Sequence, residues 1–180
     1  MPSMLLRVSW YLLLLLACAP AWHRQAWAQQ SVSEHDMKAA YILNFIQFVE
    51  WPTDSPGGAK DWSLCVSAFS PLVRPLHALH GKEAPNGQQV RVRLFDPGNA
   101  QECRMLVLQG TDLERPTQQL LHGRRGVLTL SDDPTALRAG VMIGLVEQGG
   151  RIVFDVDNTA ANRAGLTISS RLLRLARTVR

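Results

Sequence analysis

Two histidines at helical spacing are the residues of this chain that most resemble part of a metal site. His77 and His80 lie three positions apart, so a helix would place both rings on one face. No histidine, cysteine or cluster of acids nearby in the sequence completes a coordination shell. Two ligands do not make a metal site, and we interpret both histidines as surface residues.

Asp132 and Asp133 form the second group with possible chemistry, as a pair of carboxylates for general acid–base catalysis. Adjacent side chains diverge, however, and acids that precede a proline commonly cap a helix. The sequence also contains no serine-hydrolase, zinc-protease, phosphate-binding or dinucleotide-binding motif. We therefore predict that the protein is not an enzyme and uses no cofactor.

Aromatic and β-branched residues are concentrated in the stretch KAAYILNFIQFVEWP, residues 38–52. Their spacing predicts an amphipathic helix over residues 34–49, which Pro52 is expected to end. Burying aromatic rings stabilises a small domain strongly, so the rings of this helix are expected in the core. They belong to Tyr41, Phe45 and Phe48.

The rest of the chain alternates strand-like and helix-like segments. Strands are expected at residues 62–68, 90–95, 105–108, 126–130, 141–146 and 151–156. Helices are expected at residues 71–79, 112–122, 158–164 and 169–178, the last with Arg171, Arg174 and Arg177 on a face turned to solvent. The alternation indicates βαβ units, and the Gly-containing turn at 147–150 makes a hairpin of the last two strands. The predicted fold class is therefore α/β, a single domain with a mixed, mostly parallel sheet flanked by helices.

A leader is expected at residues 1–28, followed by the mature domain at 29–180. The leader has a positive flank, an apolar run at 10–19 and an A-x-A cleavage site at 26–28. The run is shorter than the roughly 20 residues that span a bilayer, which argues against a retained anchor. Cys18 lies in a sequence similar to a lipoprotein signal, but lipidation is the less favoured alternative because Leu16 fits that signal poorly.

The net charge and the cysteine content narrow the possible classes of function further. The full chain has a formal net charge of +4, and loss of the two arginines in the leader leaves +2, which argues against nucleic-acid binding. Cys65 and Cys103 then remain in a compartment expected to be oxidising, which predicts one disulfide. Structural stabilisation alone explains such a pair, while a redox-sensing role would require an exposed or strained bond.

Four segments together resemble the YfiR family of bacterial periplasmic proteins, over nearly the whole mature chain. They are KAAYILNFIQFVEWP, the strand around Cys65, VMIGLVEQGGRIVFDVDNTAANRAGL and ISSRLLRLARTVR. The resemblance implies a noncatalytic periplasmic repressor that binds the periplasmic sensor part of an inner-membrane diguanylate cyclase, lowers cyclic di-GMP and limits biofilm. It also implies a fold resembling one lobe of a periplasmic binding protein, a homodimer, and a Cys65–Cys103 disulfide needed for correct folding.

Some family members carry a second cysteine pair near the hairpin, and this sequence has none there, which puts a redox switch built on that pair in doubt. We expect the partner-binding surface at the exits of the first helix and of the last long strand. The candidate residues are Trp51, Asp155, Asp157 and Asn158. The alternative function is a small-solute-binding protein, because two lobes in a dimer could enclose a cleft.

Overall fold

The computed structural model of the protein describes residues 33–56, 61–98, 100–114 and 124–180. The expected leader lies outside these residues, as do part of the polar loop before the first predicted strand and most of the helix predicted at 112–122. All described residues belong to one compact unit. No helix within them is both long enough and apolar enough to cross a membrane.

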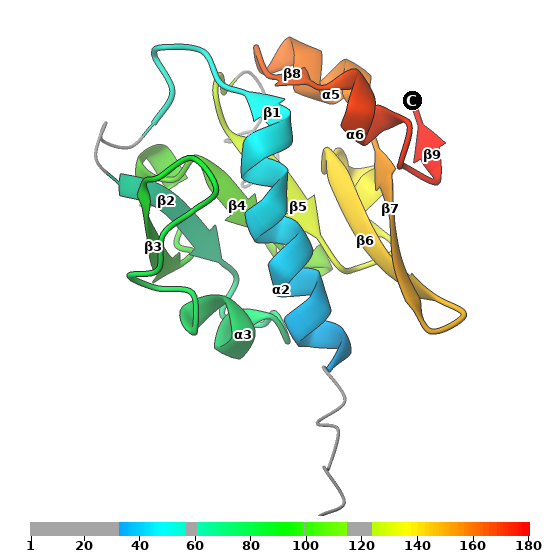
Figure 1. Ribbon diagram of the computed structural model, residues 1–180, viewed down its shortest axis with the longest axis horizontal. Helices are drawn as coiled ribbons and strands as arrows, with labels where there is room; N and C mark the ends of the chain where they lie inside the picture. Colours follow the sequence, from blue (N-terminus) through cyan, green and yellow to red (C-terminus); the bar gives the residue numbers. More distant parts are fainter. Residues whose placement is uncertain (1–32, 57–60, 99, 115–123) are drawn as a thin grey trace, which may run out of the picture. The chain divides into compact units, whose positions relative to one another are not determined.

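A seven-stranded mixed sheet forms the centre of the unit, in the order β3-β2-β4-β5-β6-β7-β9 (Figure 1). The strands are β2 (Asp61–Val66), β3 (Gln89–Leu94), β4 (Met105–Val107), β5 (Leu128–Ser131), β6 (Ile143–Gln148), β7 (Arg151–Val156) and β9 (Thr178–Val179). The first five are parallel, β7 is antiparallel to β6, and β9 is parallel to β7. The predicted α/β class, with a mixed and mostly parallel sheet, is confirmed.

The strand order reverses its direction at β2. From β2 the chain moves outward to β3 on one side, and then crosses back to β4 on the other side. In open α/β sheets, binding surfaces form outside the carboxyl ends of the strands at such a reversal. The loop that follows β2 therefore occupies a position of functional interest.

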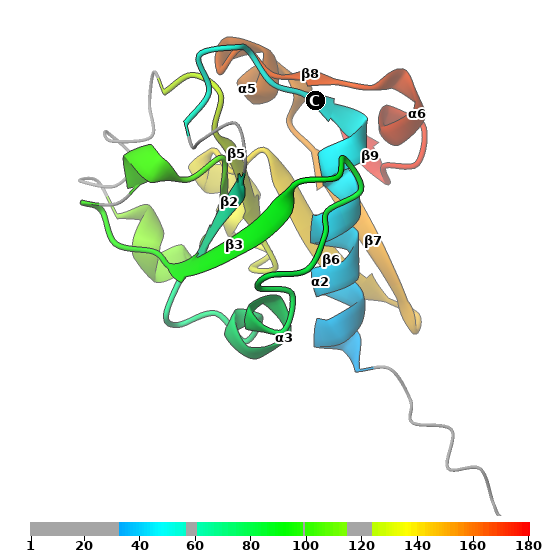
Figure 2. The same cartoon turned by 60° about the vertical axis from the view of Figure 1, so that its left-hand side comes forward.

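Helix α2 (Glu34–Phe45) crosses one face of the sheet (Figures 1 and 2). Ser33 begins it, because its hydroxyl oxygen accepts a hydrogen bond from the Asp36 N–H at 3.1 Å. Ile42 is fully buried, and the Phe45 ring lies 5.2 Å from the ring of Phe154 on β7 in an edge-to-face arrangement. The short helix α3 (Val73–His77) packs against α2 and β3 and extends this apolar layer.

The first helix is shorter than the sequence predicts. After Phe45 the chain makes one 3₁₀ turn, η2 (Ile46–Phe48), and then enters β1 (Val49–Glu50), which pairs with β8 (Thr167–Ile168) in a separate two-stranded sheet. Strand pairing, and not Pro52, therefore ends the helix. This pairing is set by residues more than a hundred positions away, so local helical spacing could not indicate it.

The three aromatic rings expected in the core differ in their burial. Phe45 is buried and Phe48 is half-buried against the core, in agreement with the prediction. Tyr41 is 38% exposed at the rim, where its ring lies 6.4 Å from the rings of Phe45 and Phe154. The prediction of burial is wrong for Tyr41.

The opposite face of the sheet carries a smaller apolar cluster beneath 3₁₀ turns. The turns are η3 (Ala100–Glu102), η4 (Gly110–Leu113) and η5 (Ala136–Ala139). Side chains alternate between the faces, so Leu64 and Val66 join the α2 side while Cys65 joins the opposite cluster. The central strands are consequently buried on both faces.

After β7 the chain forms two short helices, α5 and α6, and two short strands, β8 and β9. Asp157 caps α5 (Asn158–Arg163), and Gly165, with a φ of +75°, follows it in a conformation that favours glycine. The helix predicted at 169–178 is wrong for most of its length, because α6 spans only Ser170–Leu173 and the chain then enters β9. Pairing of β9 with the end of β7 takes residues that would otherwise continue the helix.

Replacing Ile42 by alanine tests whether the contact of α2 with the sheet is a main source of stability. We expect the free energy of unfolding to fall by about 2–5 kcal/mol, since the side chain is fully buried. Urea denaturation provides the measurement. The matched control is Leu175→Ala, which removes an apolar side chain that is 66% exposed and should change stability by about 0.5 kcal/mol or less. Equal losses of unfolding free energy in the two variants would contradict the role assigned to the contact of α2 with the sheet.

Candidate functional site

The four residues predicted for partner binding all lie at one end of the sheet, the amino end of its parallel strands. The Trp51 ring packs edge-to-face on Trp62 near the start of β2, with 4.6 Å between the ring centroids. Asp155, Asp157 and Asn158 lie at the end of β7 or just after it, and this end of β7 pairs with the start of β6. Figure 1 shows β1, α5 and the C-terminus at this same end.

Trp51 is built into an aromatic stack and is half-buried. Trp62, its neighbour, donates from Nε1 to the Met105 sulfur at 3.1 Å, and the Arg104 guanidinium carbon lies 5.0 Å from the Trp62 ring centroid. Arg104 also donates from Nε to the Pro56 carbonyl at 2.8 Å. The Trp51 indole N–H is buried and, among the described residues, has no hydrogen-bond partner. Trp51 therefore has a structural role in this packing, and its half-buried ring also reaches the surface.

Asp155 is only 8% exposed, so the prediction that it lies on an open contact surface is wrong. Its carboxylate accepts two hydrogen bonds from the Arg177 guanidinium, one of them from Nε at 2.9 Å. Arg177 donates in addition to the Gln148 side-chain oxygen at 3.2 Å. These hydrogen bonds hold the pKa of Asp155 below its usual value, although burial acts in the opposite direction. The pair fastens the segment leading into β9 to the β6–β7 hairpin.

Asp157 and Asn158 also have structural contacts. The Asp157 carboxylate accepts from the Ala160 N–H at 2.7 Å and so caps α5. The Asn158 backbone N–H donates to the Arg180 carbonyl at 2.8 Å, which joins the end of the chain to the start of α5. Partner binding by these two residues stays a prediction.

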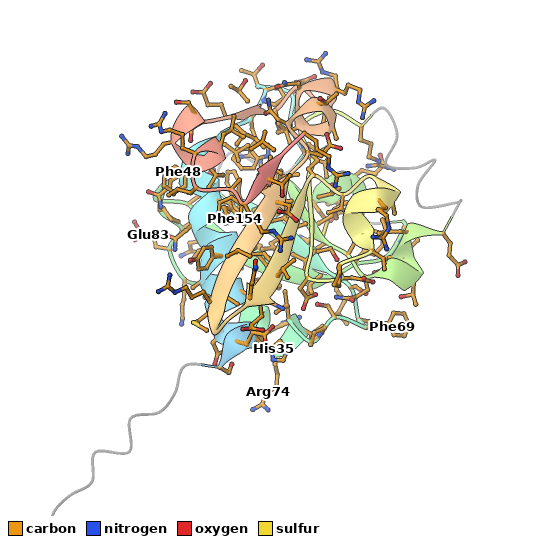
Figure 3. All side chains as sticks on the ribbon, turned by 90° about the vertical axis from the view of Figure 1, so that its right-hand side faces the viewer. His35, Phe48, Phe69, Arg74, Glu83 and Phe154 are labelled. Carbon is orange, nitrogen blue, oxygen red and sulfur yellow. A yellow bond between two sulfur atoms is a disulfide. The ribbon has the colours of Figure 1, made fainter. Side chains whose placement is uncertain are left out.

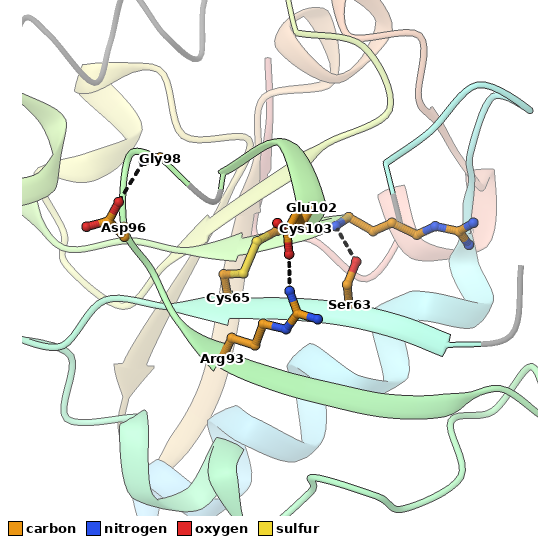
Figure 4. Close-up of a disulfide and its surroundings, with 8 residues drawn as sticks. Ser63, Cys65, Arg93, Asp96, Gly98, Glu102 and Cys103 are labelled. Carbon is orange, nitrogen blue, oxygen red and sulfur yellow. Dashed lines mark hydrogen bonds and ion pairs between the residues drawn. A yellow bond between two sulfur atoms is a disulfide. The ribbon is translucent and has the colours of Figure 1, made fainter. Parts of the chain in front are cut away.

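Cys65 and Cys103 form a disulfide whose Cα atoms are 5.8 Å apart (Figure 4). Both residues are fully buried in the second apolar cluster. An ion pair between Arg93 and Glu102 lies close to the bond, and the backbone N–H of Arg104 donates to the hydroxyl oxygen of Ser63 at 3.1 Å. Burial shields both sulfurs from soluble thiols, which favours a structural role for the bond over a regulatory one.

A buried ion pair lies at the other end of the sheet, where the parallel strands have their carboxyl ends. The Lys38 side chain on α2 is 6% exposed, and its Nζ lies 2.6 Å from a Glu34 oxygen and 3.6 Å from an Asp132 oxygen. Gln109 donates to the other Asp132 oxygen at 2.6 Å. Because loss of one partner would leave a buried charge, this contact specifies where α2 sits on the end of β5.

Asp133, the second member of the predicted pair, fills a capping role. It accepts hydrogen bonds from the backbone N–H groups of Thr135 at 2.8 Å and Gly110 at 3.0 Å. The bonds from Thr135 lower the pKa of its carboxyl group. The capping interpretation is therefore right for Asp133, whereas Asp132 forms the ion pair with Lys38 that the sequence did not indicate.

His77 is exposed, and His80 contacts the neighbouring strand. The Val92 backbone N–H donates to Nδ1 of His80 at 3.2 Å, which holds the end of the α3 region against β3. Across residues 33–180, apart from the undescribed gaps, no three His, Cys, Asp or Glu side chains gather as a metal ion would require.

The most exposed large apolar side chain of the described residues belongs to Phe69, which the sequence analysis did not single out. It lies 77% exposed in the loop between β2 and α3 (Figure 3). The signal available in the sequence was an aromatic residue in the polar turn Ser-Ala-Phe-Ser-Pro directly after a buried strand.

Comparison with known proteins gives one family and a distant structural likeness. The family model described as YfiR/HmsC-like matches residues 35–177. A crystal structure titled as a conserved domain protein from Vibrio cholerae O1 biovar El Tor strain N16961 is similar, with a TM-score of 0.49 and 12% sequence identity. The match covers 82% of this chain and 60% of that one.

A variant that lacks the disulfide tests its structural role. Replacing Cys65 and Cys103 together by alanine should lower the free energy of unfolding by about 4 kcal/mol, the value expected for closing a loop of this length. In the native protein, dithiothreitol followed by alkylation should leave both cysteines unmodified, as measured by peptide mass spectrometry. Denatured protein treated in the same way is the control. Rapid reduction of the folded protein would contradict a structural role and indicate an accessible redox bond.

The Asp155–Arg177 contact should make stability depend on pH. Since its folded-state pKa is lowered from 3.8, Asp155 contributes stability that is complete above about pH 5 and is lost as the pH falls through the folded-state pKa. Arg177→Gln should therefore melt at a lower temperature than the wild type at pH 7, and the difference should shrink below pH 4. Arg171→Gln on α6, an exposed arginine, is the matched control. A difference in melting temperature that does not change with pH would refute this role of the pair.

Proposed function

We propose that this chain, which belongs to the YfiR/HmsC-like family of periplasmic regulators, is a noncatalytic repressor of an inner-membrane diguanylate cyclase. It binds the periplasmic sensor part of the cyclase and lowers cyclic di-GMP, which limits biofilm formation. The observation that carries this proposal is the family match over residues 35–177, which takes in every strand of the seven-stranded sheet except β9.

The contacts of the reactive side chains are consistent with a regulator that performs no chemistry. Asp132 is paired with Lys38, Asp133 caps a turn and Asp155 is bound by Arg177. Each of these acids therefore has a structural partner, and none lies in a group arranged around a reacting atom. A protein of this kind acts through its surface.

A binding protein inhibits a receptor when it binds the inactive state more tightly than the active one. This mechanism requires a rigid surface, because a surface that must be ordered on binding loses part of its affinity. The core on both faces of the sheet and the buried disulfide supply that rigidity. A disulfide also suits an oxidising compartment such as the periplasm. A homodimer is part of the proposal.

Immunocapture of the untagged full-length protein from detergent-solubilised membranes of its own cells tests this function. We expect a membrane protein with a diguanylate cyclase domain to be enriched, as identified by mass spectrometry. Deleting the gene should raise cellular cyclic di-GMP, and re-expression should restore the original level.

The control is the same capture from the deletion strain. Unchanged cyclic di-GMP together with no captured cyclase would refute the proposed function.

A further inference from the structure

We infer that His80 forms a pH-sensitive contact that closes one edge of the sheet. In its uncharged form the ring accepts a hydrogen bond from the outer side of β3, and uptake of a proton by the ring ends this hydrogen bond. The inference goes beyond the proposed function and does not depend on the receptor, because the contact lies within the chain.

Strand β3 lies at one end of the strand order, so its outer side is not paired with another strand of that sheet. Residues 80–84, here called the edge segment, run along this side instead. The Gly81 N–H donates to the Val90 carbonyl at 2.8 Å, and the Val90 N–H donates to the Lys82 carbonyl at 2.8 Å. An uncovered edge strand can pair with other chains, so the edge segment protects β3 from such pairing.

Two positions farther along β3, a side chain covers the edge in place of the backbone. Val92 is only 3% exposed, and its N–H donates to Nδ1 of His80 at 3.2 Å. The carbonyl oxygen of Val92 lies at the same distance, 3.2 Å, from this nitrogen. The His80 side chain itself is exposed, so protons from the solvent can reach it. One ring nitrogen therefore faces both a donor and an acceptor of Val92.

The charge of the ring determines which of these two groups Nδ1 can bind. Nδ1 accepts from the Val92 N–H only when the ring is uncharged and carries its proton on Nε2, since both nitrogens of a charged imidazole are donors. In the charged ring, Nδ1 donates to the Val92 carbonyl and the N–H loses its acceptor. Unpaired N–H groups are rarer in folded proteins than unpaired carbonyls, which indicates that they cost more. The closed edge therefore favours the uncharged ring.

The charges next to His80 in the chain act in the same direction. A charged ring would join a group of exposed basic residues, which raises their mutual repulsion. These are Arg74, His77 and Lys82. The acid of the edge segment, Glu83, directs its carboxylate toward Gly87 in the turn before β3. Among the described residues, no carboxylate forms an ion pair with His80.

The charged side chains of the neighbouring elements are paired elsewhere. The arginines of β3 lie on the face of the sheet opposite to Val92, because side chains alternate along a strand. Helix α2, which packs against α3, carries a lysine that is bound by an acid of the same helix. The pairs are Arg91–Asp61, Arg93–Glu102 and Lys38–Glu34. Protonation of His80 is therefore not offset by these acids.

Amide hydrogen exchange of the full-length protein, followed by NMR, tests this contact. The pH is lowered from about 7.5 to about 5.5, across the range in which histidine takes up a proton. After correction for the intrinsic exchange rate, protection of the Val92 amide should fall about fivefold, the factor expected for loss of one hydrogen bond. The Val90 amide is the internal control, because its acceptor is a backbone carbonyl that does not titrate, and its protection should stay the same.

Two variants assign the effect to one histidine. In His80→Gln, protection of the Val92 amide should no longer depend on pH. His77→Gln is the matched control, since it replaces the exposed histidine one turn earlier and should behave like the wild type. Both variants should melt like the wild type, because the replaced side chains are exposed. Nitrogen-15 shifts of the wild-type ring should place its proton on Nε2 at neutral pH.

Three results would overturn the inference. They are an unchanged Val92 protection, an equal change at Val92 and Val90, and a pH dependence that persists in His80→Gln. A neutral ring with its proton on Nδ1 would also overturn it, because that ring donates to the carbonyl in both charge states. None of these results bears on the cyclase, so the proposed function is judged separately by the capture experiment.

Discussion

Burial of the central strands on both faces is the constraint on which the rest of this structure depends. The three residues of β4 are fully buried, as are Leu64, Cys65 and Val66 of the adjacent β2. Such strands need cover on both sides. Helices α2 and α3 cover one face, whereas short 3₁₀ turns cover the other within the described residues. The disulfide lies in the cluster beneath these turns and adds a covalent link to the cover of this face.

The same constraint explains which parts of the fold could be predicted from sequence. Strands buried on both faces appear as continuous apolar runs, such as Met105–Val107, and the hairpin is marked by Gly149 and Gly150 in its turn. These signals are local. The ends of the helices are not, because β1 and β9 form by pairing with strands that are distant in the sequence or already part of the sheet. The helices predicted from helical spacing were therefore too long at both ends of the domain.

Contacts between residues that are distant in the sequence also limited how much of the candidate site could be predicted. Asp155 follows an apolar strand and resembles an exposed exit residue, but the arginine that binds it was expected on a helix. Lys38 belongs to an amphipathic stretch whose polar positions normally face solvent, yet it meets Asp132 across the end of the sheet. Neither pair has a sequence signal, since ion pairing depends on which elements the fold brings together. Phe69 is different: an aromatic residue in a polar turn is visible in the sequence, and only its exposure needed the structure.

Repression by binding, as proposed for this protein, places quantitative limits on the contact with the receptor. A receptor that is about 99% active when free becomes about 99% inactive only if the repressor binds the inactive state roughly 10⁴-fold more tightly, about 5.5 kcal/mol. A strong hot-spot residue contributes about 2–4 kcal/mol. One such residue alone therefore falls short, and several contacts or simultaneous binding by two copies are needed to make up the difference. Under the proposed function, the described scaffold is held by its core and disulfide, so the element that changes between two states belongs to the receptor.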